Sequence, residues 1–159
     1  MSWVIRRMAA GDVDAVLALA KNIPEAPHWS RQDYERCATE DEAAPLRRAG
    51  FIAEASGCLL GFSAGKLVAG VCELESIAVA EEGRGRGIGG ELFEAVAKWA
   101  QVHGASRMEL EVRSSNARAI KLYEQSGLRR EGLRPGYYQD PDEDALLMGM
   151  SLEAGGKLP

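Results

Sequence analysis

The sequence predicts an α/β protein in which helices cover one mixed β-sheet. Apolar and polar residues alternate over residues 108–113, which is typical of a strand with one buried face. Apolar residues recur at helical spacing from Ile88 to Ala100, which is typical of an amphipathic helix. The predicted order is strand, two helices, three strands, helix, strand, helix and two strands, which favours a single mixed sheet packed against helices.

Capping residues mark the predicted helices. Asp12 is placed to cap a helix over residues 13–23, and Ser30 is placed to cap a second helix over residues 31–37. Asp33 follows Ser30 by three residues, as in a capping box. The other two helices are expected over residues 88–103 and 117–126, and each is closed by a glycine, Gly104 and Gly127.

Strands are expected over residues 4–8, 51–55, 58–64, 72–79, 108–113, 128–133 and 144–150. Ser56 and Gly57 form a two-residue hairpin signal between the second and third of these strands. Residues 134–143 are expected to be the loop that joins the last two strands. Residues 39–45 are acidic and alanine-rich, and we expect an irregular surface connection there.

Length and composition limit the classes of protein. At 159 residues, the chain has the length of one domain, which we expect over residues 1–152, followed by a frayed tail over residues 153–159. A net charge of −5 argues against a general nucleic-acid-binding protein. The sequence has no apolar run of membrane-spanning length and no signal peptide at its start, so we expect a cytoplasmic protein.

Metal binding is not expected. The three cysteines, Cys37, Cys58 and Cys72, include no Cys-x-x-Cys pair, and we interpret them as core residues of a reduced protein. His28 and His103 are too few to complete a metal site of recognisable spacing. Both histidines are therefore interpreted as surface or helix-end residues.

A glycine-rich stretch lies between a predicted strand and a predicted helix. Five of the eight residues from Gly83 to Gly90 are glycine, a composition that is costly inside regular structure. At a helix N-terminus, unpaired N–H groups and the helix dipole attract phosphate. Arg84 and Arg86 add positive charge. The sequence therefore predicts a pyrophosphate site on the backbone of Arg84, Gly85, Arg86, Gly87, Ile88, Gly89 and Gly90.

Three other interpretations fit this stretch less well. A Walker loop needs Lys and Ser or Thr after its last glycine, whereas Gly90 is followed by Glu91. The spacing Gly85-x-Gly87-x-x-Gly90 matches a dinucleotide-binding loop, but the acidic residue that binds the ribose is missing at the expected place. A flexible surface turn requires neither flanking arginines nor a strong helix.

Four motifs resemble those of the GCN5-related N-acetyltransferase (GNAT) family. Arg84-x-x-Gly87-x-Gly89 is similar to the family signature Gln/Arg-x-x-Gly-x-Gly/Ala. The remaining motifs are similar to those of the bacterial ribosomal-protein-alanine N-acetyltransferases: Leu110-Glu111-Val112-Arg113-x-x-Asn116, Ala119-x-x-Leu122-Tyr123 and Gly127-Leu128. The resemblance covers nearly the whole chain and is strongest over residues 74–150. Arg84 departs from the glutamine that this branch often has.

The resemblance implies one mostly antiparallel sheet of about seven strands, flanked by about four helices. Its central parallel pair, residues 72–79 and 107–112, would splay apart around acetyl-CoA. The family places the pantetheine arm on the backbone of a strand, which here is Ile77, Ala78 and Val79, and places Asn116 against coenzyme A. A splayed edge suits this arm because its N–H and C=O groups lack strand partners.

The resemblance also implies two catalytic residues. Acetyl transfer removes a proton from the amine and returns one to the leaving thiolate. Glu111 matches the family's general base, and Tyr123 matches its general acid beside the cofactor. Alternatively, Glu111 is a solvated carboxylate and Tyr123 a packing residue, and Asn116 caps a helix. Glu73 and Glu75 are rival bases, because other branches place a glutamate on that strand.

The implied acceptor is the N-terminal α-amino group of a protein, for example the N-terminal alanine of ribosomal protein S18. Trp29, Glu75, Tyr137 and Tyr138 are candidate substrate-binding residues, although the aromatic ones can instead pack in the core. The acidic residues 140–144 would favour a cationic peptide if they border the groove. Two other functions stay open: acetylation of a small amine, and non-catalytic binding of acyl-CoA.

Overall fold

The computed structural model describes residues 2–24, 26, 29–39 and 43–152. Three subjects of the predictions above lie outside this part of the chain: His28, the tail over residues 153–159, and residues 40–42 of the acidic connection. In the part that the model describes, no helix is long and apolar enough to cross a membrane.

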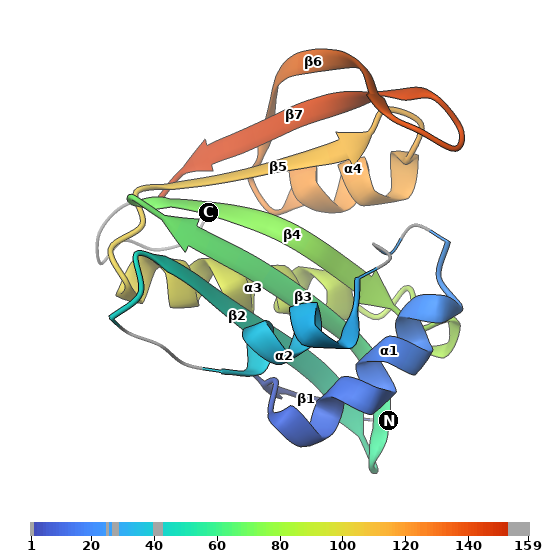
Figure 1. The fold of residues 1–159 in the computed structure, drawn as a ribbon. Helices are drawn as coiled ribbons and strands as arrows, with labels where there is room; N and C mark the ends of the chain where they lie inside the picture. Colours follow the sequence, from blue (N-terminus) through green and yellow to red (C-terminus); the bar gives the residue numbers. More distant parts are fainter. Residues whose placement is uncertain (1, 25, 27–28, 40–42, 153–159) are drawn as a thin grey trace.

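Seven strands form one sheet in the order β1-β2-β3-β4-β5-β7-β6 (Figure 1). The strands are β1 (Val4–Arg7), β2 (Leu46–Ala55), β3 (Cys58–Val68), β4 (Val71–Val79), β5 (Arg107–Arg113), β6 (Arg129–Tyr138) and β7 (Glu143–Ser151). The helices of the described part are α1 (Val13–Lys21), α2 (Arg31–Ala38), α3 (Ile88–Val102) and α4 (Ala117–Gln125), with short 3₁₀ helices η1 (Ala10–Asp12) and η2 (Glu81–Gly83). The predicted mixed sheet with flanking helices is confirmed.

The central strands β4 and β5 are parallel, and every other neighbouring pair is antiparallel. Their pairing covers three residues of β4 and ends where Glu73 lies opposite Glu109. Beyond this point the two strands separate, as Figure 1 shows. The predicted splayed pair is therefore confirmed.

A β-bulge accompanies the separation. On the other edge of β4, Ser76 pairs with Ala64 and Leu74 pairs with Gly65, so Glu75 between them has no partner on β3. A bulge bends its strand and increases the local twist. Because the bulge directly follows the last residue pairs with β5, it gives a physical reason for β4 to turn away there.

Helices cover both faces of the sheet. In Figure 1, α3 lies behind the sheet and α1 and α2 lie in front of it. Side chains alternate between the two faces along each strand. Leu74 and Leu110 lie in the same core cluster as Val96 of α3. By alternation, Glu73 and Glu111 lie on the opposite face, which they share with α1 and α2.

The predicted capping box at α2 is confirmed. The Asp33 N–H donates to Ser30 Oγ at 3.3 Å, and the Ser30 N–H donates to the Asp33 carboxylate at 2.9 Å. Asp12 occupies the predicted N-cap position of α1, but its side chain makes no capping hydrogen bond to that helix. Asp12 instead accepts from the Ala9 N–H at 2.7 Å and pairs with Arg6 at 2.8 Å.

Three strands extend at least four residues beyond their predicted bounds, and one of them is β3, which ends at Val68 rather than at Ala64. β2 begins at Leu46 rather than Phe51, and it carries Arg48, which pairs with Glu75 at 3.1 Å. β6 continues to Tyr138 through part of the predicted loop over residues 134–143. Pro135 and Gly136 resemble strand breakers, but β6 is an edge strand, where proline does not remove an essential ladder bond.

Candidate active site

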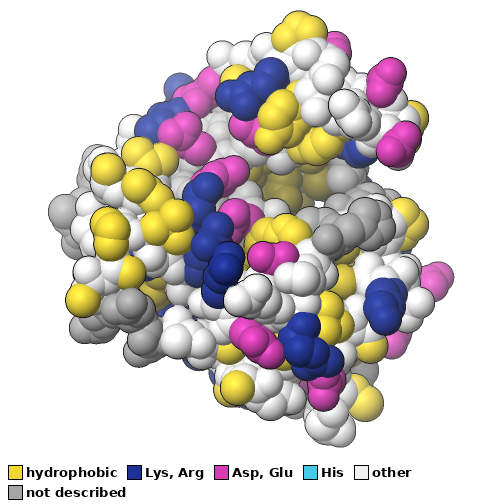
Figure 2. Space-filling model, viewed as in Figure 1, with side chains coloured by type: hydrophobic (Ala, Val, Ile, Leu, Met, Phe, Trp, Pro, Cys, Tyr) yellow, Lys and Arg dark blue, Asp and Glu magenta, His cyan; other side chains and the backbone are white. Residues whose placement is uncertain are grey.

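A hollow of about 440 Å³ lies at the place where β4 and β5 separate. Its charged lining comes from β3 to β6 and consists of Lys66, Glu73, Glu109, Glu111, Glu131 and Arg134. Four carboxylates against two cations make this lining acidic. Figure 2 shows acidic and basic side chains next to one another on this face of the molecule.

Two neighbours on β6 hold the Glu111 carboxylate. Arg134 Nη1 lies 3.2 Å from Glu111 Oε1, and the Glu111 side chain is 21% exposed. The Tyr137 hydroxyl also donates to Glu111, and this hydrogen bond raises the pKa of Tyr137. The Arg134 guanidinium lies over the Tyr137 ring at 5.1 Å. Glu111 is therefore an oriented and reachable carboxylate rather than a freely solvated one.

Tyr123 is a buried side chain of α4. Its ring centroid lies 6.5 Å from that of Phe93 on α3, so it also contributes to the core. Burial raises the pKa of Tyr123 to about 12, with a smaller contribution from Tyr138. At neutral pH the phenol therefore keeps its proton, as a proton donor must.

Tyr138 lies near both candidate catalytic residues. Burial raises its pKa to about 12, and the negative charge of Glu111 adds to this shift. Its ring meets that of Tyr137 edge to face at 5.0 Å. In the described part of the chain no hydrogen bond joins Glu111 to Tyr123, and Tyr138 interacts electrostatically with both.

The other candidates from the sequence have partners of their own. Glu73 pairs with Lys66 at 3.1 Å, and Glu75, the bulge residue, pairs with Arg48 at 3.1 Å. Trp29 packs against Tyr34 at 5.2 Å and borders the core between α1, α2 and the sheet. This contact agrees with the interpretation of Trp29 as a residue that packs in the core.

The glycine-rich stretch is an exposed turn ahead of α3. Gly87 caps the helix with a φ of 87°, a left-handed conformation that glycine adopts without steric cost. The first helical bond runs from the Glu91 N–H to the Gly87 carbonyl at 3.2 Å. Within the described residues, no carbonyl or side chain accepts from the amides of residues 85–90. The turn therefore presents consecutive free donors, together with the exposed side chains of Arg84 and Arg86.

Close packing explains a second glycine of this turn. A Cβ atom on Gly89 would lie 3.1 Å from the Leu122 side chain of α4. Gly89 thus lets the start of α3 approach α4, the helix that carries Tyr123. At the start of α4, the Asn116 side chain accepts from the Ala119 N–H at 3.2 Å, so Asn116 is a helix cap.

The backbone of Ile77, Ala78 and Val79 lies on the part of β4 that has separated from β5. These residues pair with β3 on one edge, and no strand of the described residues pairs with them on the other. The Val79 carbonyl accepts from Arg84 Nε at 3.3 Å. The free edge of β4 thus leads directly into the turn with the free amides.

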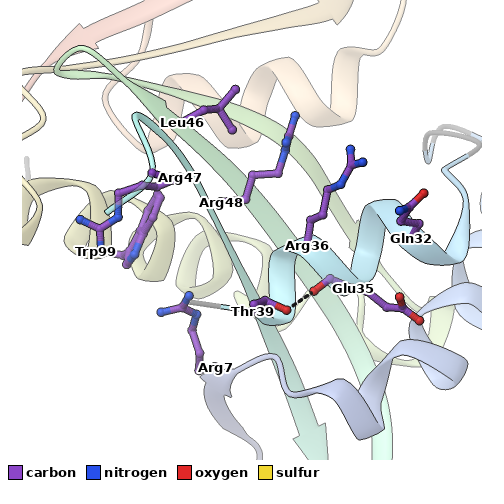
Figure 3. Close-up of a pocket in the computed structure, with 10 residues that line it drawn as sticks. Arg7, Gln32, Glu35, Arg36, Thr39, Leu46, Arg47, Arg48 and Trp99 are labelled. Carbon is purple, nitrogen blue, oxygen red and sulfur yellow. Dashed lines mark hydrogen bonds between the residues drawn. The ribbon is translucent and has the colours of Figure 1, made fainter. Parts of the chain in front are cut away.

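A second hollow, of about 390 Å³, lies where β2 extends beyond β1 (Figure 3). Arg36 of α2 and Arg47 and Arg48 of β2 line it, together with Arg7 and Trp99. It contains none of the predicted site residues. In the described part of the chain, no group of three or more His, Cys, Asp or Glu side chains is placed to hold a metal ion.

Sequence reasoning did not assign Arg134 to the site, although the structure pairs it with Glu111. The pairing joins β5 to β6, which are separated in the sheet by β7. The sequence position of Arg134 could have suggested this role, because Arg134 lies three residues before the tyrosine pair on the same strand.

Comparison with protein families decides the classification. The model of the acetyltransferase (GNAT) family matches residues 14–128. The chain belongs to the GNAT family. The GNAT assignment agrees with the splayed parallel pair and the turn before α3, and it confirms the family resemblance of the sequence motifs.

Similar proteins place this GNAT chain near the ribosomal-protein acetyltransferases. It is 30% identical over 148 residues to a putative [ribosomal protein bS18]-alanine N-acetyltransferase of Bacillus subtilis, which covers 93% of this chain and 95% of the relative. It is 33% identical over 99 residues to the [ribosomal protein bS18]-alanine N-acetyltransferase of Escherichia coli, covering 61% of this chain and 67% of the relative. The crystal structure of the Escherichia coli ribosomal-protein-S18-alanine N-acetyltransferase matches with a TM-score of 0.82 and 27% identity, covering 98% and 97% of the two chains.

Proposed function

We propose that this protein transfers the acetyl group of acetyl-CoA to the N-terminal α-amino group of a protein. The observation that carries the proposal is the free edge of β4, which leads from the acidic hollow at the start of the strand to the turn of free amides after its end. We further propose that residues 1–152 form one catalytic domain, because all seven strands belong to a single sheet.

The residues of this chain fit acetyl-CoA. Its pyrophosphate is an anion, and the turn offers the unpaired N–H groups of residues 85–90, a helix N-terminus and the side chains of Arg84 and Arg86. The Arg84 N–H is not one of these groups, because it donates to the Glu81 carbonyl at 3.2 Å. Its pantetheine arm carries amides, and the edge of β4 at Ile77, Ala78 and Val79 offers main-chain groups to pair with them. When bound, acetyl-CoA supplies the activated acetyl thioester.

In this proposal, Glu111 accepts the proton of the acceptor amine and Tyr123 donates a proton to the departing sulfur. Glu111 is suited to its role because it is oriented by Arg134 and Tyr137 yet partly exposed. Tyr123 is suited because burial keeps its phenol protonated at neutral pH. Glu73, paired with Lys66 of β3, and Glu75, paired with Arg48 of β2, are the rival bases, and variants must separate them from Glu111, which is also ion-paired.

The acceptor is proposed from the relatives and from charge. The relatives named above carry the names of alanine N-acetyltransferases of ribosomal protein S18, one of them as a putative member. The acidic hollow, lined by Glu73, Glu109 and Glu111, favours a cationic peptide end. We propose such a peptide, with N-terminal alanine, as the substrate, and Tyr137 and Tyr138 as residues that contact it.

A peptide panel tests this function. Peptides that differ only in the N-terminal residue, together with free lysine and a polyamine, are incubated with the protein and acetyl-CoA. We expect acetylation at the peptide N-terminus, fastest for alanine, and mass spectrometry locates the modified amine. Acetylation of the small amines alone would contradict a protein acceptor, and coenzyme A binding without any product would indicate a non-catalytic module.

The variant Tyr123→Phe tests the proposed acid. Removing the hydroxyl is expected to lower kcat by about 10²-fold, the lower end for general acid catalysis. The affinity for acetyl-CoA should stay the same, because the ring and its packing on Phe93 remain. Thiol release measures kcat, and calorimetry measures the affinity. An unchanged kcat would leave Tyr123 as a packing residue only.

A further inference from the structure

The tyrosine pair, Tyr137 and Tyr138, sits where the pairing of β6 with β7 is interrupted. The ladder, which shifts its register once between Arg130 and Gly132, continues to Arg134 and resumes only at Tyr138. Between these points, the Gly136 N–H donates to the Asp144 carboxylate at 2.9 Å instead of to a strand carbonyl. Strand pairing by itself therefore does not determine where the two tyrosines lie.

A single side chain of β5 holds this end of the hairpin. Arg113 Nη2 donates to the Gln139 carbonyl at 2.9 Å, and Nη1 donates to the Pro141 carbonyl at 2.9 Å. The Arg113 guanidinium also lies over the Tyr138 ring, 4.5 Å from its centroid. Arginine suits this position because its planar group can donate in two directions while it stacks on an aromatic ring.

A second contact anchors the returning strand. The Glu143 carboxylate accepts from the Ser115 N–H at 2.6 Å and from Ser114 Oγ at 3.3 Å. Arg113 Nη1 lies 3.4 Å from the same carboxylate. Both strands of the hairpin end are thus fastened to the segment between β5 and α4.

A chain of contacts connects Arg113 to Glu111, the candidate base. Arg113 and Glu111 are two residues apart on β5 and share one face of the sheet. Arg113 holds Tyr138, the Tyr138 ring meets the Tyr137 ring at 5.0 Å, and Tyr137 donates to Glu111. The strand that carries the base therefore also holds the aromatic segment that contacts it.

We propose that Arg113 is a positioning residue for the acceptor. By holding the hairpin end and the Tyr138 ring, it sets the spacing between the tyrosine pair and Glu111. The acceptor peptide binds in this space, so Arg113 governs the affinity for the acceptor and not the affinity for acetyl-CoA. The acceptor part of this inference rests on the proposed function.

The variants Arg113→Ala and Arg113→Lys test the inference. Loss of two charge-assisted hydrogen bonds is expected to raise the acceptor KM about tenfold. We expect kcat to change by less than about threefold, and the KM for acetyl-CoA to stay constant, because Arg113 contacts neither the amide turn nor Tyr123. Arg113→Lys should recover little, because one ammonium group cannot reproduce the planar fork.

Arg130→Ala is the matched control. Arg130 lies on the same strand as the tyrosine pair, but it is exposed and makes a surface ion pair with Glu124 at 3.4 Å. Its removal is expected to leave both KM values unchanged, since such pairs contribute little. An unchanged acceptor KM in Arg113→Ala would overturn the inference, and so would an equal rise in the KM for acetyl-CoA.

Hydrogen exchange separates this inference from the proposed function. In the protein without acceptor, the amides of residues 136–142 should exchange faster in Arg113→Ala than in the wild type or in Arg130→Ala. Unchanged protection would overturn the holding role whatever the enzyme's substrate. If the wild type acetylates no amine, the proposed function fails, and faster exchange in Arg113→Ala still supports the holding role.

Discussion

Glu111→Gln is expected to lower kcat/KM for the acceptor by about 10²–10⁴-fold, the range of general base catalysis. The reason is that an α-amino group, with a pKa of about 7.7–8.0, is mostly protonated at and below neutral pH. Something must remove this proton before the nitrogen attacks. The loss of kcat/KM relative to the wild type should therefore be largest near pH 6. It should become smaller toward pH 9, where more of the amine is already neutral.

A pH–rate series from pH 6 to pH 9 measures this effect. Arg134→Gln is the informative companion variant, because it removes the same ion pair at 3.2 Å but leaves the carboxylate in place. We expect Arg134→Gln to lower kcat/KM for the acceptor far less than Glu111→Gln does. Wild-type rates for Glu111→Gln at every pH would exclude Glu111 as the base. A comparable loss in Glu73→Gln alone would move the role to β4.

Gly87→Val is expected to weaken acetyl-CoA binding by about a hundredfold or more, which corresponds to about 2.7 kcal/mol. Gly87 has a φ of 87°, and a β-branched residue cannot adopt this conformation without strain. The turn would have to rearrange, and the free amides of residues 85–90 would lose their present arrangement. Calorimetric titration with coenzyme A measures the affinity directly.

Gly57→Val is the matched control for this variant. Gly57 also has a positive φ, 79°, and lies in the tight turn between β2 and β3, remote in sequence from the amide turn. Its replacement should cost comparable conformational strain but leave the affinity for coenzyme A intact. If Gly87→Val bound coenzyme A as tightly as the wild type, the amide turn would not be the pyrophosphate site.

Local patterns in the sequence were sufficient for most of the elements. The capping box of Ser30 and Asp33 was predicted because both partners lie within one helical turn. The same local reasoning found the N-cap position of Asp12 but not the partner of its carboxylate, which pairs with Arg6 instead of capping α1. It also ended β6 too early, since only its place at the edge of the sheet makes Pro135 acceptable within a strand.

The sequence by itself determined the family, the order of strands and helices, and the glycine turn, because each depends on neighbouring residues or on short motifs. The tertiary structure alone decided which partners Glu111 receives and what holds the tyrosine pair. Those contacts join β5 to β6, and they depend on the register of strands that are far apart in the chain. A shift of one residue would turn every such side chain to the other face, and no local pattern specifies that register.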